Sequence, residues 1–311
     1  MKPFLIGNAP CSWGMLEFEE AKSAEPIGYQ QMLDELAACG YTGTELGDWN
    51  FMPSDPAALR IELAKRELTM LGAFVPVALK DESAHEHGIA NAVKTAKLLA
   101  AVATAPAPYL VLADNNGTIP ERSDIAGRVS AGNSLTDDQW TTFALGAERV
   151  AKAVLEETGL RTVFHHHCAG YVETPSEIAT LLERTDPNLL GLVFDTGHFV
   201  FGAGEQGADM ISFLDRFADR IWYVHAKDCS ASIAARSRSE QWDYFASLQH
   251  GVFCELGKGT VDFDALLRWL RSRAYSDYII VEQDVLPGMG APKDSAERNL
   301  NFLRGVESAL A

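Results

Sequence analysis

Short apolar runs alternate with amphipathic segments along this 311-residue sequence, and this alternation is the feature that most restricts its fold. Neighbouring parallel strands need a crossover helix, so repeated strand–helix pairs predict a parallel sheet. We predict eight strands, at Phe4–Asn8, Tyr41–Leu46, Thr69–Val77, Tyr109–Ala113, Thr162–His167, Leu190–Asp195, Ile221–His225 and Tyr278–Glu282. The helices predicted after them are Ile27–Cys39, Pro56–Leu68, His85–Val102, Thr136–Thr158, Pro175–Arg184, Ala208–Ala218, Phe263–Arg273 and Ser295–Leu310.

Eight strand–helix pairs predict an α/β fold of the (β/α)8 TIM-barrel type, which usually takes roughly 250 residues plus insertions. A doubly wound open sheet is the alternative, but no G-x-G-x-x-G motif follows the first strand. We therefore expect one barrel domain over residues 1–311. Two long connections, Asp114–Leu135 and Asp228–Lys258, are expected at the C-terminal mouth of the barrel, where barrel enzymes keep their sites. The second of them is expected to contain a short helix.

The composition argues against several classes of partner. A net charge of −17 would repel a phosphate backbone, so nucleic acid is not an expected partner. No run of about 18 apolar residues occurs and the first residues lack a signal-peptide pattern, so neither a membrane span nor secretion is expected. The five cysteines are scattered without a C-x-x-C pair, which favours free thiols in the reducing cytoplasm.

The last four predicted strands end in side chains that can bind a metal ion, at His165–His167, Asp195, His225 and Glu282. In a closed barrel these four strand ends form an arc around one mouth, so the side chains could meet at a point. A mixed nitrogen and oxygen set suits Mn²⁺, Co²⁺, Fe²⁺ or Zn²⁺ and, less well, Mg²⁺. Alternation along the fifth strand places His165 and His167 on the face opposite to His166. One of His165 and His167 is then expected to bind metal and the other substrate.

Seven segments in order carry a family resemblance: "NAPCSWG" (8–14), "GYTGTELG" (40–47), "FHHHCAGYVETP" (164–175), "GLVFDTGHFVFG" (191–202), "VHAKDC" (224–229), "FCELGKGTVDF" (253–263) and "VEQDVLPGMG" (281–290). Together they resemble the xylose-isomerase-like TIM-barrel superfamily of sugar isomerases and epimerases. Within that superfamily they are most similar to the myo-inosose dehydratase group. The resemblance covers nearly the whole chain.

The resemblance implies that the metal is held by His165, Asp195, His225 and Glu282. Most of the superfamily has Glu at the first of these positions, whereas the inosose dehydratase group resembles this chain in having the "HHH" run. An imidazole lowers the negative charge at the metal by one and removes the carboxylate that epimerases use for proton transfer. The resemblance therefore favours elimination over isomerase or epimerase chemistry.

The implied enzyme is a metal-dependent hydro-lyase of inositol or carbohydrate catabolism that dehydrates a cyclic keto-polyol, 2-keto-myo-inositol being the expected substrate. One divalent ion, Mn²⁺ or Co²⁺ first, is the implied cofactor. The alternatives are a sugar isomerase or epimerase, and a dehydratase or hydratase of a 3-keto-glycoside, on the same barrel. A DNA-repair endonuclease of related fold would need a basic groove, which the charge of −17 disfavours. A non-enzymatic sugar binder and a homo-oligomer are also left open.

Several other residues are assigned roles around the expected metal site. Lys227 lies two positions after His225, so alternation points it into the same mouth, where its cation would stabilise an enolate. His198 and His167 are the acid–base candidates and are also expected to contact substrate, since imidazole titrates near neutral pH. Glu45 is a general base, a substrate ligand or a structural carboxylate.

Three further residues are expected near the substrate. Trp13 is expected either as an apolar wall of the pocket or as part of the core. Arg128, in the first long connection, is expected to reach substrate hydroxyls. Glu255 is expected among the substrate-binding residues, beside a glycine-rich turn at the mouth.

Overall fold

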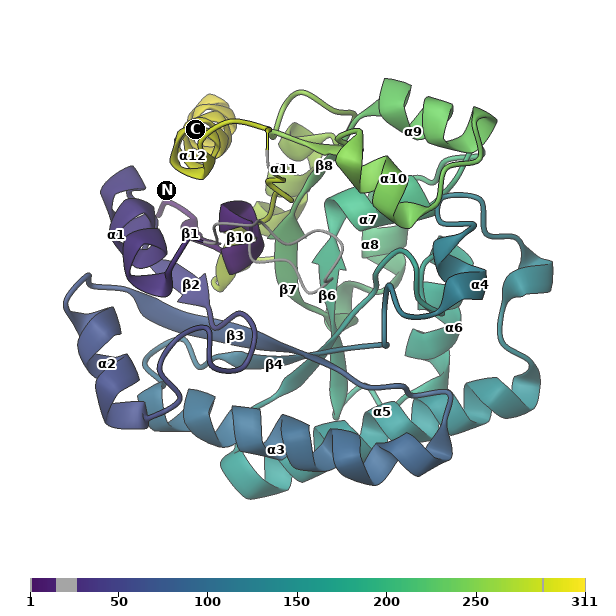
Figure 1. The fold of residues 1–311 in the computed structure, drawn as a ribbon, viewed down its shortest axis with the longest axis horizontal. Coiled ribbons are helices and arrows are strands. Elements are labelled where there is room, and N and C mark those ends of the chain that lie inside the picture. Colours follow the sequence, from purple (N-terminus) through teal and green to yellow (C-terminus); the bar gives the residue numbers. More distant parts are fainter. Residues whose placement is uncertain (1, 15–26, 287, 311) are drawn as a thin grey trace.

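The computed structural model describes residues 2–14, 27–286 and 288–310, and its centre is a closed barrel of eight parallel strands (Figure 1). In order around the barrel these are β1 (Leu5–Asn8), β10 (Tyr278–Val281), β7 (Ile221–Ala226), β6 (Leu190–Asp195), β5 (Thr162–His165), β4 (Tyr109–Ala113), β3 (Thr69–Pro76) and β2 (Gly43–Glu45). The barrel closes because β1 pairs in parallel with both β2 and β10. The predicted TIM barrel is confirmed, and the open-sheet alternative is wrong.

Eight helices correspond to the predicted crossover segments: α1 (Tyr29–Cys39), α2 (Pro56–Ala64), α3 (His85–Val102), α5 (Asp137–Thr158), α6 (Pro175–Arg184), α8 (Met210–Arg216), α11 (Phe263–Ser272) and α12 (Pro292–Ala309). Threonine side chains cap α5 and α6 through reciprocal capping boxes with Gln139 and Glu177. The helix predicted to reach Leu68 ends at Ala64 instead, shortly before Glu67 takes a left-handed conformation with φ 56°.

Strand residues divide alternately between two apolar layers. One set, which includes Val111, Val163, Val193 and Ile280, fills the inside of the barrel. Their neighbours along the same strands, such as Phe164 and Phe194, pack outward in the larger cluster shared with the helices. Polar side chains that continue the inward set are therefore delivered to the mouth of the barrel.

The first long connection contains α4 (Pro120–Ser123) and a 3-10 turn at Ala131–Asn133. A buried ion pair anchors it, because Arg122 donates to both carboxylate oxygens of Glu177 on α6, each at 2.9 Å. Glu173 adds to this anchor by accepting from the backbone N–H of Gly127 at 2.7 Å. The connection is thus packed down by satisfied charges.

The second long connection forms β8 (Asp228–Cys229), α9 (Ala231–Ser239), α10 (Tyr244–Gln249) and β9 (Phe253–Cys254). Its two strands pair as a small antiparallel sheet, and α9 and α10 lie far from α3 and α5 in Figure 1. The short helix that we predicted is therefore present, with a second helix and a two-stranded sheet beside it.

A further short helix, α7 (Thr196–Gly202), directly follows β6 and was not predicted. Its sequence, "TGHFVFG", has no polar face and contains two glycines, so it lacks helical periodicity. Asp195 begins it by accepting from the backbone N–H of His198 at 2.8 Å.

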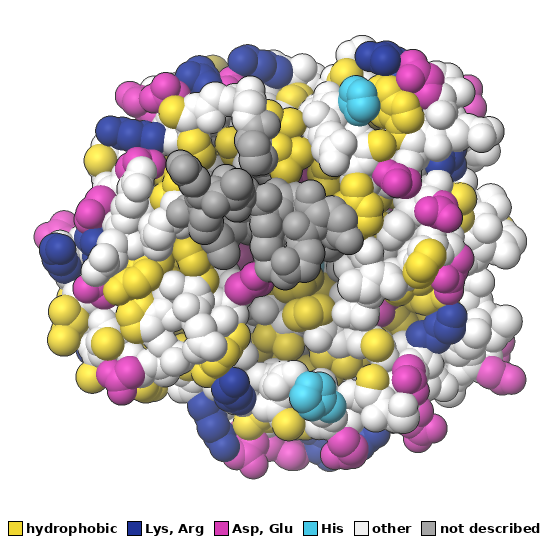
Figure 2. All heavy atoms as spheres, in the orientation of Figure 1, with side chains coloured by type: hydrophobic (Ala, Val, Ile, Leu, Met, Phe, Trp, Pro, Cys, Tyr) yellow, Lys and Arg dark blue, Asp and Glu magenta, His cyan; other side chains and the backbone are white. Residues whose placement is uncertain are grey.

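Two surface properties bear on partners. None of the described helices combines the length and the apolar character that crossing a bilayer requires. On the face shown in Figure 2, lysine and arginine side chains are scattered among acidic ones and form no single basic patch.

Candidate metal and substrate site

Four neighbouring strands deliver the side chains that we predicted as metal ligands to one buried point at the mouth. Each of the four comes two positions after an inward-facing residue of its own strand, at Val163 and His165, Val193 and Asp195, Tyr223 and His225, and Ile280 and Glu282. Because side chains alternate along a strand, each therefore points into the barrel.

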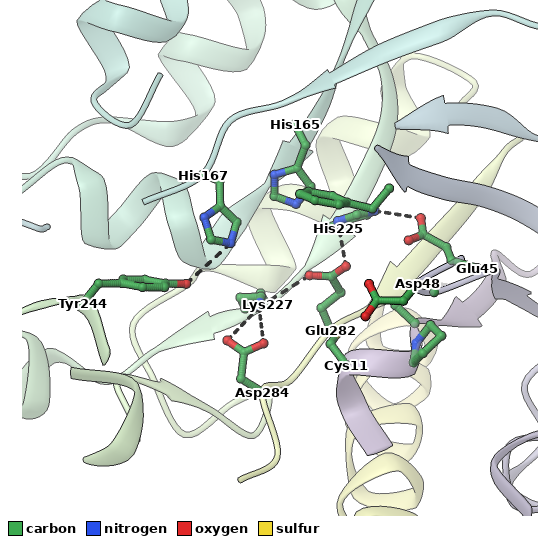
Figure 3. Close-up of a pocket in the computed structure, with 14 residues that line it drawn as sticks. Cys11, Glu45, Asp48, His165, His167, His225, Lys227, Tyr244, Glu282 and Asp284 are labelled. Carbon is green, nitrogen blue, oxygen red and sulfur yellow. Dashed lines mark hydrogen bonds and ion pairs between the residues drawn. The ribbon is translucent and has the colours of Figure 1, made fainter. Parts of the chain in front are cut away.

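The four side chains form a compact cluster, which we call the metal cluster. One nitrogen or oxygen atom from each lies within 4.8 Å of those of the others. The Oδ2 atom of Asp195 is 3.9 Å from Nε2 of His165 and 4.0 Å from Nδ1 of His225. That Nδ1 atom lies 3.1 Å from Oε1 of Glu282 (Figure 3). All four residues are at most 8% exposed.

Two atoms of the metal cluster face this point without a hydrogen bond from the described part of the chain: Oδ2 of Asp195, and Nδ1 of His225, whose contact there is the 3.1 Å ion pair with Glu282. Leaving a buried acceptor unpaired costs ~1–3 kcal/mol, so such atoms usually have a partner. A cation at the common point would satisfy both. The donor set, two imidazoles and two carboxylates, fits a single divalent metal ion.

Each imidazole of the cluster is held through its other nitrogen. Nδ1 of His165 donates to the carbonyl of His166 at 2.6 Å, which leaves Nε2 facing the cluster. Nε2 of His225 lies 3.1 Å from Oε1 of Glu45, which leaves Nδ1 facing it. Metal-binding histidines in proteins are commonly oriented in this way.

Burial and neighbouring charges shift the pKa values within the cluster in opposite directions. Burial raises the pKa of Asp195 to about 7. Burial also lowers the pKa of His165 well below its usual value, with the charge of His225 adding to this. For His225 itself, burial lowers the pKa but the carboxylates of Glu282 and Glu45 outweigh it, and the pKa is raised to about 9. The buried cluster thus contains carboxylates and imidazoles whose pKa values depend on one another's charges.

A buried lysine lies next to the metal cluster. Nζ of Lys227 is 3.0 Å from both carboxylate oxygens of Asp284 and 3.4 Å from Oε2 of Glu282 (Figure 3). Although burial lowers the pKa of Lys227, these carboxylates raise it well above its usual value. The mouth therefore contains a fixed ammonium group beside the metal cluster. Asp284 was not among the predicted site residues, although it lies two positions after Glu282 and alternation would have indicated it.

His167 faces the same cavity from the opposite side. Its Nδ1 donates to the carbonyl of Cys168 at 2.6 Å, so its Nε2 is an acceptor and lies 3.5 Å from the Tyr244 hydroxyl. Burial lowers the pKa of His167 to about 3. His166 points the other way, as alternation predicts, and accepts from the backbone N–H of Asp195 at 3.1 Å.

His198 lies behind His167 and does not belong to the described lining of the cavity. The two rings are in contact, with centroids 3.8 Å apart and planes tilted by 37°, and Nδ1 of His198 accepts from the backbone N–H of Cys168 at 3.2 Å. The structure therefore places His198 as a support for His167 and not at the cavity surface.

The cavity is also lined by residues that were not predicted from the sequence, among them Cys11, Asp48, Phe74 and Tyr244. Tyr244 comes from α10 in the second long connection. The sequence predicted a short helix in this connection at the mouth, but no local signal singled out Tyr244 as the side chain that faces the cavity. Glu45, which we did predict as a candidate, belongs to the same lining.

Three predicted substrate residues lie outside the described lining of the cavity, and their polar groups have other partners. The buried Trp13 ring donates from Nε1 to Glu35 at 2.8 Å. Arg128 donates to the backbone carbonyls of Ser237, Trp242 and Asp124. Glu255 forms ion pairs with Lys258 and Arg298, and the bond from Arg298 contributes most to lowering its pKa to about 2.

Comparison with known proteins adds to this geometry. Residues 33–306 match the family model described as xylose isomerase-like TIM barrel. The chain is 32% identical to the inosose dehydratase of Geobacillus kaustophilus (strain HTA426), covering 100% of this chain and 97% of that protein. It is 30% identical to the inosose dehydratase of Lacticaseibacillus casei, covering 96% and 95%. A solved structure of the IOLI protein with a bound zinc atom superposes with a TM-score of 0.68 at 15% identity, over 98% of each chain.

Proposed function

The chain belongs to the xylose isomerase-like TIM barrel family, and from this premise we propose that it is a metal-dependent hydro-lyase that dehydrates a cyclic keto-polyol. The substrate that we propose is 2-keto-myo-inositol (inosose). The observation that carries the proposal is the arrangement of the mouth, where His165, His225 and Glu282 of the metal cluster line one cavity with an ammonium group and an imidazole acceptor. Full-length similarity to proteins named inosose dehydratase supports the choice of substrate.

We propose that His165, Asp195, His225 and Glu282 hold one divalent ion, with Mn²⁺ or Co²⁺ first and Zn²⁺, Fe²⁺ or Mg²⁺ as alternatives. When bound, such an ion acts as a Lewis acid that polarises the substrate carbonyl and makes the adjacent C–H more acidic.

In this proposal Lys227 stabilises the negative charge that develops on the substrate oxygen as the C–H proton leaves. Asp284 holds its ammonium group through two contacts of 3.0 Å, so the cation is fixed before the substrate arrives. Charges fixed in advance stabilise a transition state without the cost of reorganising solvent. Since it faces two carboxylates, Lys227 is suited to stabilising an anion and not to removing a proton.

His167 is the proposed proton acceptor because of its position, although burial lowers its pKa to about 3 and makes it a weak base. Its tautomer is set by the Cys168 carbonyl, which leaves the Nε2 lone pair directed toward the cavity and the Tyr244 hydroxyl. The ring of His198 packs against it, with centroids 3.8 Å apart. After accepting the C–H proton, His167 could return a proton to the departing hydroxyl on the same side of the ring.

The test is direct. Purified protein loaded with Mn²⁺ or Co²⁺ is incubated with 2-keto-myo-inositol, and we expect the ultraviolet absorption of a conjugated enone or diketone, with loss of one water by mass spectrometry. A 3-keto-glycoside is assayed in parallel. Bound metal with no product from either compound would contradict the proposal.

Two controls separate the proposal from its alternatives. The Asp195→Asn variant should give no product, because it removes one of the four ligands. The reaction is also run in deuterated water, where an isomerase or epimerase would place deuterium in a recovered, undehydrated ketose. That result without dehydration would favour the isomerase class.

We also propose a cytoplasmic location. All five cysteines of the sequence are free in the structure, which suits a reducing compartment.

A further inference from the structure

We propose that Glu45 is a positioning residue: its carboxylate selects the tautomer and the ring orientation of His225, and through them the metal affinity of the cluster. This inference rests on the metal site of the proposed function. It replaces the three roles that the sequence left open for Glu45 by one that acts through another side chain.

The contact between the two residues is buried and spans the barrel interior. Oε1 of Glu45 is 3.1 Å from Nε2 of His225, and the two residues are 5% and 1% exposed. Glu45 ends β2, whereas His225 lies on β7, and β1 and β10 lie between these strands. At this level β1 is followed by Ala9, a small residue of the inner layer, which leaves room for the Glu45 side chain to reach across.

A local irregularity in β2 accompanies this reach. The pairing of β2 with β3 shifts its register between Thr44 and Glu45. Bulges of this kind re-aim a single side chain and recur next to functional sites.

The consequence for His225 follows from imidazole chemistry. A bound metal ion would take the place of one of the two ring protons, and an imidazole that keeps its Nε2 proton for donation to Glu45 then offers Nδ1 as the lone pair. That Nδ1 faces Oε1 of Glu282 at 3.1 Å and Oδ2 of Asp195 at 4.0 Å, where the proposed ion would be held. Without the carboxylate, the proton is free to move to Nδ1 and the ring is free to turn.

The two imidazoles of the metal cluster differ in what orients them. His165 is held by the backbone carbonyl of its own neighbour, which no substitution of a side chain removes. His225 depends on a side chain 180 positions earlier in the sequence. Glu45 is therefore the place where ligand orientation can be altered without touching a ligand.

The experiment measures metal affinity in the absence of substrate. Wild type, E45Q and E45A are titrated with Mn²⁺ and with Zn²⁺ against a competing chelator. We expect E45A to bind about 10–100-fold more weakly, the usual effect of losing such an outer partner. E45Q should lose less, because its amide oxygen can still accept from Nε2. D277N, which removes a carboxylate just before β10 at the end of the barrel away from the mouth, is the matched control and should change affinity less than about threefold.

A second measurement reports the tautomer itself. In the zinc-loaded wild-type protein, nitrogen NMR should show His225 with a proton on Nε2 and metal on Nδ1, and E45A should lose this signature. If Glu45 were instead the general base, E45Q would keep the wild-type affinity and tautomer and lose about 100–10,000-fold in kcat at saturating metal. That outcome, or unchanged affinity in a folded E45A, would overturn the inference.

Failure of this inference is distinguishable from failure of the proposed function. If the wild-type protein binds no metal, both the metal site and the proposed function are contradicted. If wild type and E45A bind metal equally well, only the role of Glu45 falls. Circular dichroism checks that E45A is folded, and E45Q supplies the comparison if it is not.

Discussion

Two clusters of buried charge among the described residues, one at the mouth of the barrel and one between the first long connection and α6, differ in how their carboxylate oxygens are used. In the metal cluster, Oδ2 of Asp195 accepts no hydrogen bond from the described residues. In the second group, which we call the Arg122 cluster (Arg122, Glu173 and Glu177), every carboxylate oxygen accepts. Both oxygens of Glu177 accept from Arg122, and those of Glu173 accept from the backbone N–H groups of Gly127 and Ala169.

The difference teaches how a binding site is told from a structural network. Burial and charge are common to both clusters, so neither property separates them. The Arg122 cluster satisfies its own carboxylates and ties the first long connection to α6. The metal cluster directs side chains from four strands toward one point, and Oδ2 of Asp195 has no hydrogen bond there from the described residues. Unpaired buried acceptors that converge therefore indicate a ligand, whereas paired ones indicate structure.

The largest effect is expected from Asp195→Asn in the metal cluster. Its remaining amide oxygen can still cap α7, but the metal loses a charged ligand, so we expect affinity to fall more than about 1,000-fold, or ~4 kcal/mol. Stability of the chelator-treated protein should not fall, because no satisfied bond is lost. Metal analysis and urea unfolding measure the two quantities. Equal metal content in the variant would remove the distinction between the clusters.

The next largest effect is expected from Arg122→Met. The variant leaves Glu177 buried without its cation, which should cost about 3–5 kcal/mol of the free energy of unfolding. Urea unfolding gives this quantity, and metal affinity should stay within about threefold of wild type. Neutralising both partners, in R122M/E177Q, should recover part of the loss, because the amide oxygen keeps the capping box of α6 while the unpaired buried charge is removed. An unchanged urea midpoint for R122M alone would contradict a structural role.

A smaller effect concerns pH. Burial raises the pKa of Glu173 from its usual 4.5 to about 7. The folded protein therefore holds this proton more tightly than the unfolded chain does. The resulting stability is fully present below pH 4.5 and is lost as the pH rises to about 7. Removing the titrating group in E173Q should flatten this dependence by ~1–3 kcal/mol. Urea midpoints of both proteins across that range provide the measurement, and parallel curves would count against it.

The sequence predicted the barrel well because each strand carries its own signal. All eight barrel strands lie within or near their predicted ranges, since apolar runs and turn residues are local features. The inward direction of His165, Asp195, His225 and Glu282 also follows from local alternation once the strands are placed. Their meeting follows from closure of the barrel, which the number of strand–helix pairs indicates.

The rest of the site depends on the tertiary positions of the long connections, which no local sequence pattern determines. Tyr244 reaches the cavity from α10, whose position is set by tertiary packing of a long connection. Arg128 lies in the other long connection, where its guanidinium donates to three backbone carbonyls. The sequence alone does not reveal these partners. Trp13 lies two positions after Cys11, which lines the cavity, but its own ring donates a hydrogen bond to Glu35 on α1 instead.

Closure of the barrel by β10 has a consequence for when the site comes into being. Glu282 directly follows β10, and this strand pairs with β1 from the other end of the chain as well as with β7. A growing polypeptide therefore lacks Glu282 until synthesis has passed β10. This side chain reaches its place only when β10 has paired with β1. For the proposed function this means that the four ligands come together only in the finished barrel, so metal affinity should rise at the last step of folding.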